Sequence, residues 1–306
     1  MTKTAFLFSG QGAQKLGMAR DLYDQYETVK ATFDEASQAL GYDLRALIDN
    51  DEEKLNETKY TQPAILTTSV AILRLLSENG IKPDLVAGLS LGEYSALVAS
   101  GIIDFQEAVK LVAKRGQYMT EAAPTGSGKM VAVMNTDPAL IEEICQKAAE
   151  FKGGIVSPAN YNTPAQIVIG GEVEAVDYAV ELLKEAGVRK LIELKVSGPF
   201  HTAILKPASE KLALELDKID FRPFELPLIS NTSAKVMEND EVKGLLTRQV
   251  MEPVRFYESV ETMQKLGATR FIEVGPGRVL SGFIKKIDKN AEIANVENLA
   301  SFEALI

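Results

Sequence analysis

The sequence predicts an α/β protein in which a helix-covered parallel sheet carries a smaller α/β unit as an insertion. Three observations support this prediction. Short apolar runs such as "FLFSG", "DLVAGLS", "LPLISNT" and "TRFIEVGPG" end in small or turn residues, as strands do. Longer amphipathic segments separate them, and this alternation indicates parallel strands joined by helices. The stretch 129–196 differs because two strand-like runs follow each other directly there.

Length and composition fit one large domain or two smaller ones. The chain has 306 residues, of which 46% are hydrophobic and 25% are charged. No apolar run is long enough to span a bilayer, and no basic segment followed by an apolar run marks a secretory signal. The sole cysteine, Cys145, excludes internal disulfides and suits a reducing compartment. We therefore expect a cytoplasmic, monomeric protein that does not associate with membranes, with Cys145 as a buried helix residue.

The single histidine and the acidic charge argue against two classes of function. Zinc sites made of several His and Cys ligands cannot be assembled around His201 alone, and no calcium-loop pattern is present. The sequence does not exclude a metal site made of oxygen ligands, although we expect no metal. The formal net charge of −10 argues against nucleic acid as the main partner, because phosphate binding needs clustered positive charge.

The first predicted strand, 5–8, leads into a loop rich in glycine and then a helix, as at the start of a dinucleotide site. That fingerprint requires a small residue where Lys15 stands, and an acidic residue at a second strand about 20 residues later. The later segment has helical periodicity instead. A phosphate-binding loop at "APTGSGKM" fails as well, because Ala123 and Met130 stand where Gly and Ser or Thr are needed. Nucleotide binding is therefore a weak hypothesis.

Two long helices are predicted next, in "QPAILTTSVAILRLLSENG" and "DFQEAVKLVAKRGQYMTEA", the second with Asp104 as its N-cap. The stretch from 129 to 196 then has the order β-α-β-β-α-β, with its first helix opened by Asp137 and Pro138. This order is that of a ferredoxin-like unit. We predict a large α/β domain made of residues 1–125 and 197–306, and an inserted small ferredoxin-like subdomain at 126–196.

The strongest chemical signal is Gly88-x-Ser90-x-Gly92, which follows the apolar run "DLVAG" and precedes the helical "EYSALVAS". Strand, sharp turn and helix form the context of a nucleophile elbow, so an α/β-hydrolase-like core is predicted. The alternative is a tight turn in which Ser90 caps the helix, with Glu93 completing a capping box. The predicted order of strand, sharp turn and helix favours the interpretation of Ser90 as a nucleophile.

A serine nucleophile needs a base, and only His201, in "KVSGPFHT", can be a histidine base. It follows the serine in the chain, as in α/β-hydrolases, and lies in a Gly-Pro turn between the two predicted domains, where clefts form. No Asp or Glu between the two residues is a clear third member. A backbone carbonyl is the alternative partner that could orient the imidazole.

The motifs "FLFSGQGAQ", "GLSLGEYSALVASG", "KRGQYM", "ANYNTPAQIVIGG", "VSGPFHT", "TRQVMEPVRF" and "FIEVGPGRVLSG" follow one another along nearly the whole chain. In this order they resemble the malonyl-CoA:acyl carrier protein transacylases, and more widely the acyltransferase domains of fatty acid and polyketide synthases. The resemblance implies that Ser90 carries the malonyl group as an ester and that His201 is its general base. It also implies that the main-chain carbonyl of Gln249 orients His201, and that Arg115 holds the malonyl carboxylate.

Arg115 has a second interpretation, since beside Lys110 and Lys114 it could be a solvated helix charge. Its planar fork nevertheless suits bidentate binding of a carboxylate. The resemblance further implies that the backbone N–H groups of Gln11 and Leu91 form an oxyanion hole, which gives the N-terminal glycine loop a function.

Four further features complete the comparison with the family. Met119 and Asn160 match positions that line the acyl pocket. Phe200 agrees with malonyl-selective domains. Leu89 departs from the pattern, because many relatives have His before the nucleophile, and the departure leaves His201 as the only histidine.

The resemblance implies ping-pong transfer of malonyl from malonyl-CoA to the phosphopantetheine thiol of acyl carrier protein, supplying extender units for fatty acid synthesis. No cofactor is expected. A serine hydrolase that releases free malonate and a non-catalytic scaffold for a carrier protein are the alternatives. The family's carrier is acidic, so docking needs local positive charge on this acidic chain. The candidate cations are Arg189, Lys190, Lys285 and Lys286.

Overall fold

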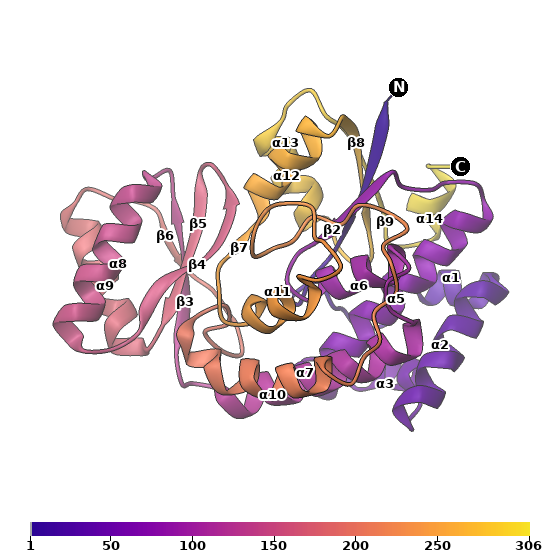
Figure 1. The fold of residues 1–306 in the computed structure, drawn as a ribbon, viewed down its shortest axis with the longest axis horizontal. Coiled ribbons are helices and arrows are strands. Elements are labelled where there is room, and N and C mark those ends of the chain that lie inside the picture. The colour runs from indigo at the N-terminus through magenta and orange to yellow at the C-terminus, as the bar shows by residue number, and fades with distance from the viewer. Residues whose placement is uncertain (1) are drawn as a thin grey trace.

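The computed structural model describes residues 2–306, and it confirms the predicted α/β class (Figure 1). The first of two sheets is parallel throughout, with strand order β2–β1–β8–β9. Its strands are β1 (Lys3–Phe8), β2 (Leu85–Gly88), β8 (Ala268–Val274) and β9 (Glu292–Val296). A parallel sheet must be covered on both faces, and β1 shows how this is achieved.

Alternate side chains of β1 enter two different hydrophobic clusters. Phe6 and Phe8 belong to the cluster formed with the helices between β1 and β3, whereas Ala5 and Leu7 belong to the cluster formed with α12 and α13. The helices that precede β3 are α1 (Arg20–Gln25), α2 (Glu27–Leu40), α3 (Leu44–Asn50), α4 (Glu52–Leu55), α5 (Thr58–Glu78), α6 (Gly92–Ala99) and α7 (Phe105–Ala122). Those that follow β6 are η1 (Ala203–Leu205), α10 (Lys206–Leu216), α11 (Val242–Gln249), α12 (Phe256–Lys265), α13 (Val279–Ile287) and α14 (Leu299–Glu303).

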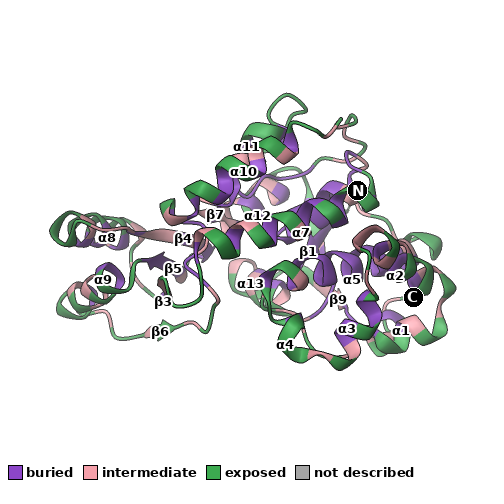
Figure 2. Cartoon of the chain, turned by 90° about the horizontal axis from the view of Figure 1, so that it is seen from below, coloured by how far each residue is buried: buried purple, intermediate pink, exposed green. Residues whose placement is uncertain are grey.

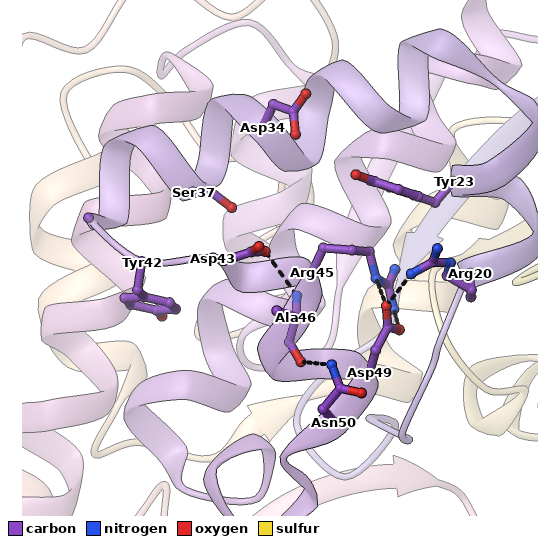
Figure 3. Close-up of a pocket in the computed structure, with 11 residues that line it drawn as sticks. Arg20, Tyr23, Asp34, Ser37, Tyr42, Asp43, Arg45, Ala46, Asp49 and Asn50 are labelled. Carbon is purple, nitrogen blue, oxygen red and sulfur yellow. Dashed lines mark hydrogen bonds and ion pairs between the residues drawn. The ribbon is translucent and has the colours of Figure 1, made fainter.

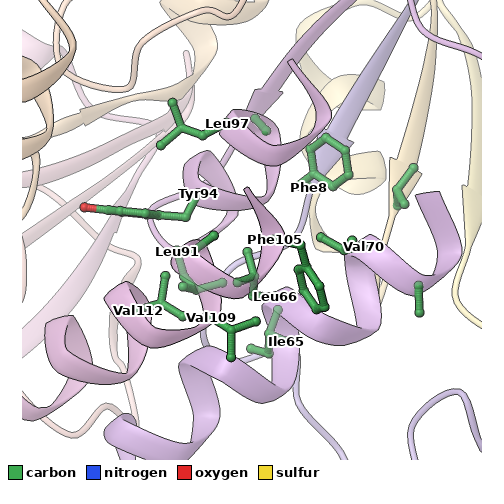
Figure 4. Packing of buried hydrophobic residues seen from close by; sticks show 14 of the residues in the cluster. Phe8, Ile65, Leu66, Val70, Leu91, Tyr94, Leu97, Phe105, Val109 and Val112 are labelled. Carbon is green, nitrogen blue, oxygen red and sulfur yellow. The ribbon is translucent and has the colours of Figure 1, made fainter. Parts of the chain in front are cut away.

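Helix α6 lies against both α5 and α7, and this packing fixes the start of the helix (Figure 4). Leu91 and Tyr94 are completely buried in the same cluster as Leu66 of α5 and Val112 of α7. Asp104 caps α7 as predicted, since its side chain accepts the N–H of Gln106 at 3.1 Å. The segment after β2 is therefore held from both sides.

The second sheet has the order β6–β3–β5–β4–β7, and two helices pack on it. The elements from 129 to 193 follow the predicted order: β3 (Lys129–Met134), α8 (Pro138–Lys152), β4 (Val156–Thr163), β5 (Gln166–Gly171), α9 (Val173–Glu185) and β6 (Leu191–Glu193). They enclose a core of their own that includes Cys145. Figure 2 shows the outer faces of α8 and α9 exposed, with buried residues on the side of the sheet.

Two details differ from the sequence-based expectation. The expected strand around 226–232 forms only isolated bridges, from Leu228 to Val86 and from Ile229 to Val236. Pro227 has no N–H to pair, and the chain turns directly afterwards. The second sheet also gains β7 (Val254–Arg255), which pairs in parallel with β4 and comes from outside the predicted insertion. Because β7 has only two residues, it shows no periodicity in the sequence. The boundaries 126–196 of the inserted subdomain stay a prediction.

Within residues 2–306, no helix combines the length and the apolar character needed to cross a membrane.

Candidate active site

Ser90 lies at a sharp turn between β2 and α6, and its backbone φ of 55° is in the left-handed region that L-residues rarely adopt. The flanking glycines are needed for space. A Cβ on Gly88 would lie 2.0 Å from the carbonyl carbon of Gly92, and one on Gly92 would lie 2.0 Å from the carbonyl oxygen of Phe8. The backbone N–H of Ser90 donates to Asn231 Oδ1 at 2.8 Å. The turn therefore has the geometry of a nucleophile elbow.

His201 contacts the serine through one ring nitrogen and the backbone through the other. Its Nε2 lies 2.7 Å from Ser90 Oγ, and its Nδ1 lies 2.7 Å from the carbonyl oxygen of Gln249. Because a carbonyl only accepts, Nδ1 carries the hydrogen and Nε2 is left to accept the serine proton. The backbone carbonyl thus occupies the place that an acidic residue has in a Ser-His-Asp triad.

Burial lowers the pKa of His201 to about 4, and the positive charge of Arg115 acts in the same direction. Hydrogen bonds with backbone groups of Gln249 and Glu252 oppose the shift. The imidazole is therefore neutral at physiological pH, which is the state that a general base needs.

Arg115 is buried, with 1% of its surface exposed, so the solvated helix charge is the wrong interpretation. Its Nη1 donates to Gln62 Oε1 at 2.9 Å, and its Nη2 donates to Gln249 Oε1 at 2.9 Å. Nη2 also lies 3.4 Å from Ser90 Oγ, and the guanidinium carbon lies 5.2 Å from the centre of the Tyr94 ring. A fixed, desolvated cation therefore stands directly beside the nucleophile.

The loop after β1 reaches the elbow because it has glycine at the point of contact. A Cβ on Gly10 would lie 2.3 Å from the carbonyl oxygen of Leu89. Among the hydrogen bonds of residues 2–306, neither the N–H of Gln11 nor that of Leu91 has an acceptor. The side chain of Gln11 is held by Thr58, whose Oγ1 lies 3.0 Å from Gln11 Nε2. Two backbone donors next to Ser90 are thus unused.

A cavity of about 620 Å³ opens at Ser90 and is lined by the loops after β1 and β2, by strands of the second sheet and by α13. The predicted site residues in its wall are Ser90, His201, Gln11, Met119, Asn160 and Phe200. The three others are buried and adjoin Ser90: Leu91 follows it in the chain, Arg115 Nη2 lies 3.4 Å from its Oγ, and Gln249 Nε2 lies 2.9 Å from its carbonyl oxygen. The structure therefore brings all nine predicted residues to one place.

Sequence reasoning missed several polar groups of this site. Gln62, Asn231 and the side chain of Gln249 all contact Ser90 or Arg115. Nothing in the sequence distinguished Gln62 from the other polar residues of α5, and the other two lie on segments far away in the chain. Glu93 forms no capping box, because no side-chain cap bond is present at α6.

A second hollow, of about 630 Å³, lies among α1, α2 and α3 and contains no predicted site residue. Both of its arginines are paired within the hollow, since Arg20 and Arg45 bind the carboxylate of Asp49 (Figure 3). Nothing in that lining provides a nucleophile with a base. No group of three or more His, Cys, Asp or Glu residues in the described chain is placed to hold a metal ion.

The chain is similar to known proteins over nearly its whole length. Residues 5–302 match the family model described as "Acyl transferase domain". The chain is 46% identical over 308 residues to a malonyl CoA-acyl carrier protein transacylase of Bacillus subtilis (strain 168), covering 100% of this chain and 97% of the relative. It is 48% identical over 290 residues to the protein of that name from Escherichia coli (strain K12), covering 94% and 93% of the two chains.

Solved structures agree with these relatives. The crystal structure of MCAT from Streptococcus pneumoniae is 68% identical, with a TM-score of 0.97 and 99% of both chains covered. A malonyl-transacylase in complex with its type II PKS acyl-carrier protein is 44% identical, with a TM-score of 0.95 and coverage of 99% and 98%.

Proposed function

Because the chain belongs to the acyl transferase domain family, we propose that it transfers the malonyl group from malonyl-CoA to the phosphopantetheine thiol of acyl carrier protein. The product supplies extender units for fatty acid synthesis. One observation supports this proposal above the others: the buried Arg115 guanidinium lies 3.4 Å from the Ser90 hydroxyl. An acyl group with a distal carboxylate is the substrate that such a cation selects.

In the first half-reaction, the malonyl carboxylate binds to Arg115 and the thioester carbonyl faces Ser90. His201 Nε2 takes the hydroxyl proton as Oγ attacks the carbonyl carbon. The oxyanion that forms accepts hydrogen bonds from the free N–H groups of Gln11 and Leu91. When the carbon–sulfur bond breaks, the proton passes from His201 to the thiolate, and coenzyme A leaves.

The second half-reaction reverses these steps with a new thiol. The phosphopantetheine thiol of the carrier gives its proton to His201 and attacks the malonyl ester. The same oxyanion hole holds the tetrahedral intermediate, and Ser90 recovers its proton when the ester bond breaks. Every proton and acyl transfer is accounted for by residues of the chain and its two substrates, so the proposed reaction requires no cofactor. The location that we propose is the cytoplasm.

Intact-mass measurement after incubation with malonyl-CoA, acetyl-CoA and methylmalonyl-CoA tests the proposal. A malonyl adduct on Ser90 should form and should disappear when a carrier thiol is added. Ser90→Ala should abolish the adduct and the transfer while keeping the fold, because a smaller side chain fits the turn. A peptide map that places the adduct on another residue would refute the assignment. Release of free malonate without a thiol acceptor would favour the serine hydrolase.

A further inference from the structure

Glu93 is a fully buried carboxylate for which the mechanism above has no use. It lies on α6, three residues after the nucleophile, and none of its surface is exposed. An isolated carboxylate in a protein interior is strongly destabilising unless it is paired or hydrogen-bonded. Its partners therefore indicate why this residue is tolerated there.

Both oxygens of Glu93 accept hydrogen bonds from residues that contact the elbow. Oε1 accepts the backbone N–H of Asn231 at 2.9 Å, and Oε2 accepts Nε2 of Gln249 at 2.8 Å. Asn231 in turn accepts the N–H of Ser90 and donates to the carbonyl oxygen of Gly88 at 2.6 Å. The carboxylate therefore anchors two side chains that reach the serine from different segments.

The contact with Gln249 also decides which way its amide points. An ionised carboxylate only accepts hydrogen bonds, and so does the carbonyl of Ser90, which lies 2.9 Å from Gln249 Nε2. Both require the NH₂ group of the amide on that side. Oε1 of Gln249 is thereby left to face Arg115, whose guanidinium has only donors to offer.

We propose that Glu93 is a positioning residue for acyl specificity, because its carboxylate fixes the Gln249 amide and, through it, the guanidinium of Arg115 beside Ser90. The inference rests on the proposed function, since it concerns the same acyl site. Polarity runs in one direction through three side chains, with Arg115 donating to Gln249 and Gln249 donating to Glu93. A substitution that replaces the acceptor at Glu93 by a donor should therefore disturb Arg115 although neither Gln249 nor Arg115 is itself substituted.

Glu93→Gln is the variant that does this with the least change in shape. Its side-chain oxygen can still accept the N–H of Asn231, but its NH₂ group then faces Nε2 of Gln249. The two NH₂ groups then oppose each other, while the carbonyl of Ser90 still requires the Gln249 NH₂ group on that side. The Gln249 side chain must therefore shift away from its position, and the hydrogen bond that holds Nη2 of Arg115 is weakened or lost.

The measurement is the ratio of kcat/KM for malonyl-CoA to kcat/KM for acetyl-CoA. Hydrogen bonds to charged groups contribute about 1.5–3 kcal/mol. We therefore expect the ratio to fall by about ten- to a hundredfold in Glu93→Gln, with acetyl transfer much less affected. A purely structural role predicts instead that both substrates lose activity equally, and that result would overturn the proposal.

Gln249→Met provides the second arm, because it removes the amide while keeping the length of the side chain. It should lower the ratio by itself, and Glu93→Gln should then have no further effect on the ratio in that background. Additive effects of the two substitutions would overturn the proposal, and so would an unchanged ratio in Gln249→Met, whether or not Glu93→Gln folds. The malonyl adduct on Ser90 of the unmodified protein is measured first. Its absence would refute the proposed function, whereas an intact adduct with an unchanged ratio would refute only the role of Glu93.

Discussion

Replacing Arg115 with alanine tests how the acyl group is recognised. In malonyl-CoA a single methylene separates the carboxylate from the thioester carbonyl that Ser90 attacks. A guanidinium whose Nη2 lies 3.4 Å from Ser90 Oγ is close enough to bind that carboxylate while the carbonyl faces the serine. Acetyl-CoA has no such group and leaves the buried cation without an anionic partner.

The magnitude follows from the two hydrogen bonds that a fork makes to a carboxylate. At about 1.5–3 kcal/mol each, they contribute about 3–6 kcal/mol. One tenfold change in rate corresponds to about 1.4 kcal/mol, so kcat/KM for malonyl-CoA should fall by about a hundred- to ten-thousandfold. Acetyl transfer should hold steady or rise, because the unpaired cation that opposed it is gone.

Specificity constants for both thioesters in Arg115→Ala, Arg115→Lys and Lys114→Ala give the comparison. The lysine variant should restore only part of the malonyl activity, since one ammonium cannot reproduce a two-point fork. Lys114 is the matched control, because it is the neighbouring cation on α7 and pairs at the surface with Glu215. Thermal unfolding shows whether each variant is folded. Equal losses for malonyl and acetyl transfer in Arg115→Ala would mean that the residue is structural and that the carboxylate is recognised elsewhere.

Three further predictions concern the base, its neighbour and the carrier. Because the pKa of His201 is lowered to about 4, kcat/KM for acetyl-CoA, which makes no use of Arg115, should be retained as pH falls and should decline only near pH 4; a midpoint near 6.5 would contradict this. Gln249→Ala keeps the main-chain contact with His201 but removes the side-chain contact with Arg115, so malonyl transfer should fall about tenfold or more, measured against acetyl transfer. Charge reversal of the exposed candidate cations should raise KM for the carrier but not for malonyl-CoA, and equal effects on both would exclude this docking surface. The residues to reverse are Arg189, Lys190, Lys285 and Lys286.

The elbow and the order of elements were predictable because their signals are local. Gly88, Ser90 and Gly92 lie within one turn, and the steric reason for Gly88 is the backbone of Gly92 itself. Asp104 and Asp137 mark helix starts by a side-chain contact with a nearby backbone N–H. These features depend on neighbouring residues, whereas Gly92 is also required by the distant backbone of Phe8.

The polar network around Arg115 could not be predicted in this way. Whether a lysine-flanked arginine is solvated or buried depends on which face of α7 packs against α5. Gly116 allows this approach, since a Cβ there would lie 2.6 Å from the carbonyl oxygen of Thr58. The side-chain contacts of Gln249 join segments more than a hundred residues apart, and no periodicity reports them. The resemblance to the family identified its main-chain role and left the amide out.

The amide of Gln249 separates two buried groups of opposite charge, and the separation itself has a consequence for binding. Burial raises the pKa of Glu93 to about 7, while the hydrogen bonds from Asn231 and Gln249 and the charge of Arg115 favour its ionised form. A direct ion pair would satisfy Arg115 within the free protein, and an incoming carboxylate would have to displace Glu93. With a neutral amide between them, the guanidinium is held in place yet keeps most of its positive charge for the substrate. The arrangement thus provides a fixed cation that has no direct anionic partner in the free protein. Under this condition a malonyl group is preferred to an uncharged acyl group.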